Sequence, residues 1–302
     1  MAVIDRHPAV KDCFVELTVS QIQDRGGLAD LFEEGRLILL KDYRLNFDFG
    51  AMANLEKSLG AIEDPDVRRK LKKMTAPYFF KGKKPQEQNG RLIFTDPVRQ
   101  AIFDTLCAGN RDTFERAAKA LRYAHDEVLR LFELCFPQYE TFRFIPSVRL
   151  TRTLFENLHW DNHSIDDDFH QARIFANLDS RPRIWSISHC FIDWVRDNYE
   201  RYDLKRFAGR DPNLLIQFVT GEIMGGTTAT WKDDFPRHRV AFEPGEVWLG
   251  ESRLLSHQIF YGEAAMVYMW FVTAASMADP ANRFNERVES LHREMHAHAK
   301  AA

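Results

Sequence analysis

The pentapeptide His-Trp-Asp-Asn-His at positions 159–163 decides which fold and which chemistry the sequence predicts. Side chains alternate along a strand with a period of two, so His159 and Asp161 point to the same side and can bind one ion. This spacing alone is frequent by chance. A second histidine, His257, lies far downstream, in a segment (242–272) that indicates strand, turn, strand, turn and strand. Together the three residues predict a metal site.

Two imidazoles and one carboxylate on one side of a metal leave the opposite positions open, as in the non-haem Fe(II) oxygenases. Two open positions suit a bidentate 2-oxo acid, and the third suits O2. Oxidative decarboxylation of the 2-oxo acid then supplies an oxidant strong enough for an unactivated C–H bond. Because Asp161 is a carboxylate rather than Gly or Ala, the site favours hydroxylation over halogenation.

Composition bounds the class of protein. The 302 residues are 45% apolar and 13% aromatic, which is typical of a folded globular chain. The net charge of −3 gives no reason to expect a nucleic-acid partner. No apolar run reaches the roughly 18–20 residues that span a bilayer, which leaves peripheral membrane contact open. The four cysteines are scattered without ligand spacing, and we therefore expect free thiols and a cytoplasmic location.

Periodicity predicts a single domain (1–302) with three successive parts. Residues 1–137 are mainly helical, 138–277 form the β core, and 278–302 form a C-terminal helix with His292 at its solvated end. Helical periods are predicted over 15–32, 52–74, 96–106 and 112–136, with short helices at 191–198 and 213–224. Strands are predicted at 36–40, 141–145, 148–158, 173–177, 183–187, 242–250, 256–262 and 264–272.

The distal carboxylate of a 2-oxo acid inside an apolar barrel needs a cationic partner, and the guanidinium of arginine matches it in bidentate geometry. No basic residue follows His257 before Arg283, which is past the predicted strands. Arg173, on the strand after the pentapeptide, is the first candidate, and Arg149, on the strand before it, is the second. An ordinary salt bridge is the alternative for each. His163 is either a neighbour of the site or a loop histidine.

Several segments resemble the Kdo hydroxylases of the Fe(II)/2-oxoglutarate-dependent dioxygenase superfamily. These segments lie at 173–177, 182–185, 244–248, 256–257, 262 and 277–280, and the resemblance covers roughly residues 140 to 285. It implies a mixed α+β fold, with a distorted double-stranded β-helix, a jelly-roll or cupin-like barrel, and flanking helices.

The resemblance also implies iron on His159, Asp161 and His257, with 2-oxoglutarate held by Arg173 and helped by Trp185 and Arg149. It further implies O2 as a reactant, ascorbate as a supporting reductant, and a Kdo sugar of the lipopolysaccharide inner core as substrate. From the residues alone, Trp185 is a core aromatic.

Other functions stay open on the sequence alone. The first is a 2-oxoglutarate-dependent hydroxylase of a free amino acid or other small polar metabolite. The second is a metal- or sugar-binding β-barrel without catalysis, because a barrel does not by itself imply chemistry. A zinc-dependent isomerase on a similar barrel is a weaker hypothesis, since such an enzyme usually has more histidines close together than this sequence offers.

Overall fold

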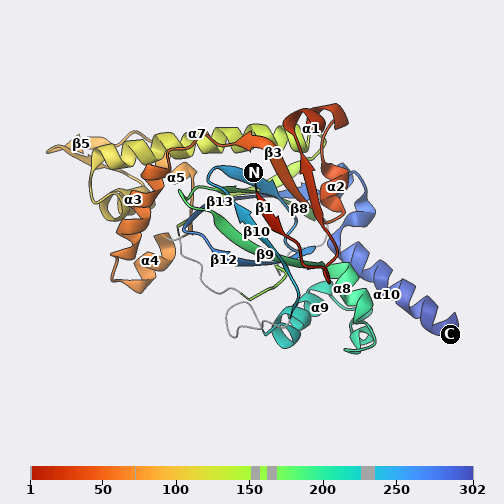
Figure 1. Cartoon of the computed structure of the whole chain (residues 1–302). Coiled ribbons are helices and arrows are strands. Elements are labelled where there is room, and N and C mark those ends of the chain that lie inside the picture. Colours follow the sequence, from red (N-terminus) through yellow and green to blue (C-terminus); the bar gives the residue numbers. More distant parts are fainter. Residues whose placement is uncertain (1, 72, 151–156, 162–168, 226–234, 302) are drawn as a thin grey trace.

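The computed structural model describes residues 2–71, 73–150, 157–161, 169–225 and 235–301. It is a mixed α+β fold, with helices on both sides of two large sheets (Figure 1). The strands are β1 (Val3–Asp5), β2 (Phe14–Leu17), β3 (Leu37–Arg44), β4 (Lys73–Thr75), β5 (Gln86–Gln88), β6 (Arg91–Ile93), β7 (Thr141–Leu150), β8 (Phe169–Asn177), β9 (Arg183–Cys190), β10 (His238–Phe242), β11 (Glu246–Leu249), β12 (Leu255–Tyr261) and β13 (Ala264–Thr273).

The helices include short 3-10 and π turns, labelled η. They are α1 (Val19–Arg25), α2 (Ala29–Glu33), α3 (Phe49–Gly60), α4 (Pro65–Leu71), α5 (Pro77–Phe80), α6 (Pro97–Ala101), η1 (Ile102–Leu106), α7 (Arg111–Cys135), α8 (Phe191–Asp197), η2 (Leu204–Phe207), α9 (Pro212–Phe218), η3 (Val219–Ile223), η4 (Ala274–Ser276), η5 (Pro280–Asn282) and α10 (Phe284–Ala301). Within the described ranges, no helix is long and apolar enough to cross a membrane.

Two sheets carry the architecture. The larger has the strand order β2-β3-β11-β8-β13-β7-β4, and the smaller has the order β1-β10-β9-β12. From β8 onward the chain passes repeatedly between them, since β8, β11 and β13 join the larger sheet while β9, β10 and β12 join the smaller one. Neither sheet closes on itself through the described strands. The N-terminal part contributes to both sheets, through β1 on one and β2, β3 and β4 on the other.

The inner faces of the two sheets pack against each other. Alternation along each strand sends one set of side chains into this space, among them Phe175 and Val267 from the larger sheet and Trp185, Val240 and Ile259 from the smaller. These five side chains are at most 8% exposed. The space between the sheets is therefore a largely apolar interior.

The outer face of the larger sheet is covered by helices. Ile174 and Met266 project from it into a second core with Leu55 of α3 and with Leu121 and Val128 of α7. In Figure 1, α7 runs across the top of the sheet. The amphipathic period that predicts this helix places one apolar stripe against the strands, and the Asn110 side chain caps its first turn by accepting from Thr113 N.

A third core lies at the end of the sheets where α8, α9 and α10 gather (Figure 1). Trp160, from the pentapeptide, packs there with Phe191, Leu215 and Val288. Trp160 therefore anchors the pentapeptide by its apolar side chain, while the flanking His159 and Asp161 point elsewhere.

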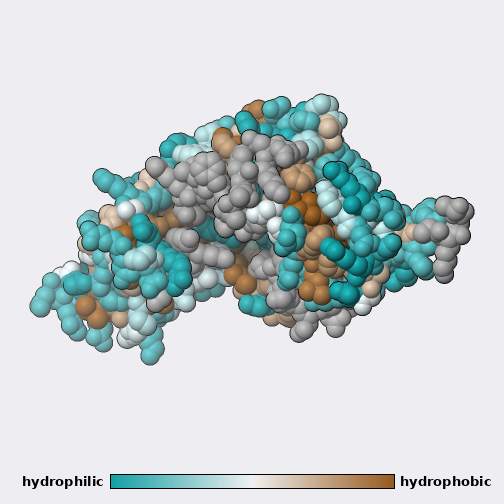
Figure 2. All heavy atoms as spheres, turned by 90° about the horizontal axis from the view of Figure 1, so that it is seen from below, coloured by the Kyte–Doolittle hydropathy of each residue, from teal (hydrophilic) through white to brown (hydrophobic). Residues whose placement is uncertain are grey.

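Seen from below, hydrophilic residues cover most of the described surface, and a hydrophobic patch lies right of the centre of the view (Figure 2).

Glu33 ties the N-terminal part to the end of the β region. Its buried carboxylate accepts hydrogen bonds from the Tyr139 hydroxyl at 2.8 Å and from the backbone N–H groups of Ala278 and Asp279 at 2.8 and 2.9 Å. These contacts join α2 to the segment between β13 and α10, far apart in the sequence.

Most local predictions are confirmed, with the following corrections. Residues 73–75, at the end of the predicted helical stretch 52–74, form strand β4, because they pair with β7. The predicted strand at 242–250 is the end of β10 and the whole of β11, since a turn separates the two. Residues 14–17 form strand β2 rather than the start of a helix, because they pair in parallel with β3, and four residues cannot distinguish the two periods. His292 is buried and not solvated, since its Nδ1 is 2.6 Å from the Tyr199 hydroxyl. The predicted strand at 148–158 is confirmed as far as Leu150, and residues 151–156 lie outside the described ranges.

Candidate metal centre

The pentapeptide meets β12 through one pair of backbone hydrogen bonds. His159 N donates to His257 O at 3.1 Å, and His257 N donates to His159 O at 2.9 Å. This isolated antiparallel bridge places the two residues opposite each other, and their ring centroids are 4.6 Å apart. Two histidines separated by almost a hundred residues thus become neighbours because the segments that carry them pair at the edge of the smaller sheet.

Asp161 completes the group. Its Oδ1 lies 3.5 Å from His159 Nε2 and 4.0 Å from His257 Nε2, and one ligand atom from each residue lies within 4.8 Å of the others. Metal bonds to such ligands are about 2.0–2.2 Å long, so one ion fits between the three atoms. The structure therefore brings together all three residues that the sequence predicts as ligands.

Both imidazoles are oriented by backbone carbonyls. His159 Nδ1 is 2.7 Å from Asn157 O, and His257 Nδ1 is 3.2 Å from Leu255 O. A carbonyl can only accept, so each Nδ1 carries the proton and each Nε2 lone pair is left for a metal. Burial, reinforced by the neighbouring His159, lowers the pKa of His257 to about 3. The ring is thus neutral, as metal binding requires.

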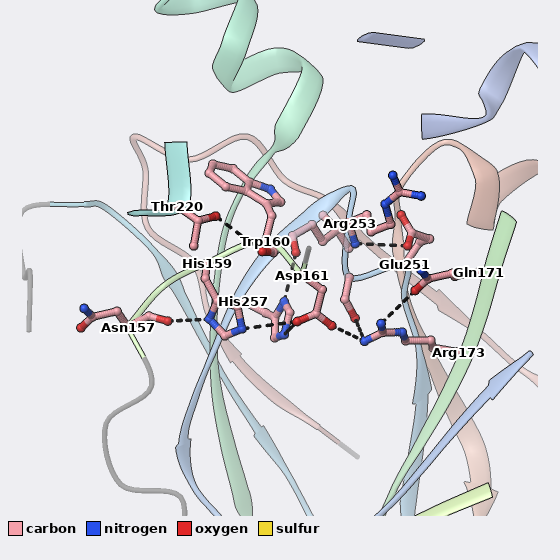
Figure 3. A network of polar contacts seen from close by, with 12 residues as sticks. Asn157, His159, Trp160, Asp161, Gln171, Arg173, Thr220, Glu251, Arg253 and His257 are labelled. Carbon is pink, nitrogen blue, oxygen red and sulfur yellow. Dashed lines mark hydrogen bonds and ion pairs between the residues drawn. The ribbon is translucent and has the colours of Figure 1, made fainter. Parts of the chain in front are cut away.

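Arg173 lies directly beside the metal ligands rather than at a distance from them (Figure 3). Its Nη1 donates to Asp161 Oδ2 and to Ser252 Oγ, the latter at 2.8 Å, while its Nη2 donates to Gln171 Oε1 at 2.9 Å. Alternation on β8 explains the arrangement, because Gln171 and Arg173 are two residues apart and share the inner face with Phe175. The guanidinium compensates the charge of Asp161 inside the protein.

The other two predicted cosubstrate residues also face the interior. Trp185 of β9 stacks on the His257 ring, with centroids 5.5 Å apart and an interplanar angle of 26°. Arg149 of β7 lies opposite Ala265, whereas Arg173 lies opposite Met269 on the same strand β13. Four residues separate these positions along β13, which corresponds to about 13 Å. Arg149 is therefore well away from the ligands, and Trp185 is next to them.

Buried donors without acceptors test whether a 2-oxo acid fits this interior. Among the buried side-chain N–H groups that have no hydrogen-bond partner within the described residues, Trp185 Nε1, Trp248 Nε1 and Gln171 Nε2 belong to this interior. A buried donor that lacks an acceptor is costly, so an interior with several of them suits a ligand rich in acceptor oxygens. These donors, together with the two imidazoles and the carboxylate of Asp161, fit a metal-bound dicarboxylate.

Gln171, Ser252 and Trp248 were not predicted as site residues. Gln171 follows from the same period of two that places Arg173, so alternation could have found it. Ser252 lies in the loop between β11 and β12, where no periodic pattern exists, and only the tertiary structure brings it to the site. Of the other histidines, His163 lies outside the described residues, and His125 is a structural residue whose Nδ1 is 2.7 Å from the Tyr268 hydroxyl.

A second carboxylate group lies apart from this centre. Glu56 of α3, Asp179 and Glu263 line a cavity of about 930 Å³, together with Arg181. Burial, with further contributions from a hydrogen bond to Glu263 and from the charge of Asp179, raises the pKa of Glu56 to about 8. Glu56 is therefore protonated at neutral pH.

No protein-family model and no curated protein matches the sequence. Solved structures do match it in fold. A cobalt(II) complex of the Kdo hydroxylase KdoO, a non-heme Fe(II) alphaketoglutarate dependent dioxygenase, aligns with a TM-score of 0.56 over 92% of this chain and 95% of that chain, at 12% identity. The complexes of KdoO with succinate and Fe(III), and with alphaketoglutarate and Fe(III), give TM-scores of 0.56 and 0.55 over the same shares, at 13% identity. At this identity the likeness shows that the chain shares the fold of KdoO.

Proposed function

We propose that this protein is an Fe(II)/2-oxoglutarate-dependent dioxygenase that hydroxylates an unactivated C–H bond. The observation that carries the proposal is the convergence of His159, Asp161 and His257, two imidazoles and one carboxylate, at the interior between two sheets. This is the ligand set that leaves open positions on iron for a bidentate 2-oxo acid and O2. The fold shared with KdoO supports the same assignment.

The two sheets are the two halves of a distorted double-stranded β-helix, or jelly roll. The support is the order of the strands, because β7, β13, β8 and β11 are neighbours in one sheet, and β12, β9 and β10 are neighbours in the other. The bridge between His159 and His257 adds the pentapeptide to the free side of β12. The whole chain acts as one oxygenase domain, since its N-terminal strands extend both sheets.

The cosubstrate lies along the inner face of the larger sheet. Arg173 borders its metal-chelating end, because its guanidinium is bonded to Asp161. The unpaired indole N–H of Trp185, beside the ligand His257, is a donor for the distal carboxylate, and Arg149 lies farther along the inner face. Arg173 thereby combines two tasks, since it stabilises the ligand carboxylate and meets the cosubstrate.

When bound, iron supplies the site for O2 activation by the 2-oxo acid, with ascorbate as the reductant that keeps it ferrous. The protein's own part is to orient and to exclude water. Asn157 O and Leu255 O fix the two imidazoles, and Trp185 stacks against His257. The apolar interior behind them keeps solvent from the reacting groups.

The substrate class is a Kdo-type sugar acid of lipopolysaccharide, either lipid-linked or free. The support is the fold shared with the Kdo hydroxylase KdoO over 92% of the chain and the residues of the β core that resemble that family. We place the enzyme in the cytoplasm, which agrees with its four free cysteines.

The test is conversion of 2-oxoglutarate to succinate by the purified protein with Fe(II) and O2. We expect turnover in the wild type and in His298→Ala, which removes an exposed histidine of α10. We expect none in His159→Ala or His257→Ala. Turnover that survives both ligand substitutions contradicts the proposal, and a wild type that binds no Fe(II) after anaerobic reconstitution supports the non-catalytic barrel instead.

The substrate class is tested separately, by mass spectrometry of core sugars incubated with the active enzyme. A Kdo-containing lipid should gain one oxygen. If only a free amino acid or another small polar metabolite is hydroxylated, the Kdo assignment is wrong while the reaction class stands.

A further inference from the structure

We propose that Ser252 is a positioning residue of the metal centre, which holds the ligand Asp161 in place from two directions. The inference rests on the proposed function, because it assumes a metal between the triad residues. Ser252 belongs to the loop Glu251-Ser252-Arg253, which connects β11 to β12 and leads directly into the strand of His257.

The first direction is the backbone of Asp161. Its N–H donates to Ser252 O at 2.9 Å, so the loop holds the backbone of the aspartate. Two residues earlier, His159 is held by the backbone of His257. The two ligands of the pentapeptide are thus fixed by consecutive parts of one segment, residues 252–257.

The second direction is the carboxylate of Asp161, reached through Arg173. One nitrogen, Nη1, donates both to Ser252 Oγ at 2.8 Å and to Asp161 Oδ2. The other, Nη2, donates to Gln171 Oε1 at 2.9 Å. Ser252 and Gln171 therefore each hold one terminal nitrogen of the guanidinium. Ser252, Gln171 and Arg173 are all at most 4% exposed.

These hydrogen bonds determine which oxygen of Asp161 faces the metal position. With Oδ2 bound to Arg173, Oδ1 is the atom that faces His159 and His257, at 3.5 and 4.0 Å. Without the Ser252 hydroxyl, Nη1 loses an acceptor that holds it beside Oδ2, and the guanidinium competes with the metal for the carboxylate. Partners that orient a metal ligand in this way are typically worth 10–100-fold in metal affinity.

The loop itself is anchored to the helices α9 and α10. Arg253 Nη2 lies 3.5 Å from Asn213 Oδ1 and 3.3 Å from Asn285 Oδ1, and its guanidinium carbon lies 4.2 Å from the centre of the Phe284 ring. Glu251 accepts from Arg253 N at 3.1 Å within the loop. These contacts hold Ser252 in place. The Arg173 side chain that is hydrogen-bonded to Ser252 is therefore held in place as well.

The experiment is titration of the metal-free protein with Co(II), without 2-oxoglutarate, followed by the ligand-field absorption of the ion. We expect Ser252→Ala to weaken Co(II) binding about tenfold or more with little change in melting temperature. Ser252→Thr, which keeps the hydroxyl, should restore most of the affinity. The matched control is Ser256→Ala, because Ser256 is also buried and adjoins His257, but its hydroxyl donates to His189 O at 3.1 Å.

A double-mutant cycle shows whether Ser252 acts through Arg173. In an Arg173→Gln background, Ser252→Ala should change Co(II) affinity by less than about twofold. The inference is overturned if Ser252→Ala binds Co(II) like the wild type, if Ser256→Ala weakens it equally, or if the effect persists without Arg173. A wild type that binds no Co(II), or binds it equally after His257→Ala, overturns the proposed function instead.

Discussion

Removal of Asp161 should destabilise the protein even when no metal is present. In Asp161→Ala the guanidinium of Arg173 loses the carboxylate that accepts from its Nη1 but stays buried, since Arg173 is 4% exposed. The hydroxyl of Ser252 and the amide oxygen of Gln171 still accept from it, but neither carries a charge. The variant therefore holds a buried cation that has lost the carboxylate bonded to it.

The size of the loss follows from this geometry. Removing one partner of a buried ion pair costs about 3–5 kcal/mol. The side chain of Asp161 is 23% exposed, so water reaches the vacated position and the lower end of that range applies. Unfolding entropies of about 2 cal/mol/K per residue convert about 3 kcal/mol into a fall of roughly 5 °C in melting temperature for a chain of this length.

The assay is urea unfolding with a chelator present, followed by circular dichroism. A second substitution, Arg173→Met, should recover at least about 1.5 kcal/mol in the Asp161→Ala background, because removing both charges also removes the cost of burying them. Arg173→Met alone should destabilise the protein. A loss below about 1 kcal/mol for Asp161→Ala, or no recovery in the double variant, would refute this account of the pair.

Three further predictions follow from buried polar groups. Because the pKa of Glu56 is higher in the folded than in the unfolded protein, the protonated carboxyl stabilises the fold at low pH, and this contribution is lost as the pH rises through about 8. In urea unfolding, the wild type should therefore lose about 1–2 kcal/mol relative to Glu56→Gln between about pH 5 and pH 9. The partial exposure of Glu56 limits the size of the effect. Trp185→Phe should weaken 2-oxoglutarate binding in calorimetry by roughly 10- to 100-fold, the worth of one hydrogen bond to a charged group, and leave Co(II) affinity unchanged. Glu33→Ala should lower stability in thermal unfolding by about 3 kcal/mol because three donors lose their acceptor, whereas Glu34→Ala, at an exposed position, should stay within about 0.5 kcal/mol.

Elements defined by a local pattern could be predicted from the sequence. The long helix α7 and the strands β8, β9, β12 and β13 all lie where periodicity and turn residues indicate them. A spacing of two on the pentapeptide was enough to propose that His159 and Asp161 share a side. These signals are local, because the side-chain direction at one residue fixes that of its near neighbours.

Contacts between distant segments could not be predicted in the same way. Strand β2 looked helical because its parallel pairing with β3 is not encoded in four residues, and His292 looked solvated because its partner Tyr199 is on another segment. Charge and position predict Arg173 as a cosubstrate residue, whereas no local pattern indicates its bond to Asp161.

The sequence by itself determined the residue types of the metal centre and the faces of the strands that carry them. Only the tertiary structure decided how those residues are held, through the backbone bridge between His159 and His257 and through the loop that brings Ser252 beside Arg173. The physical reason is that a period fixes which way a side chain points, whereas the partner it meets depends on how separate segments pack.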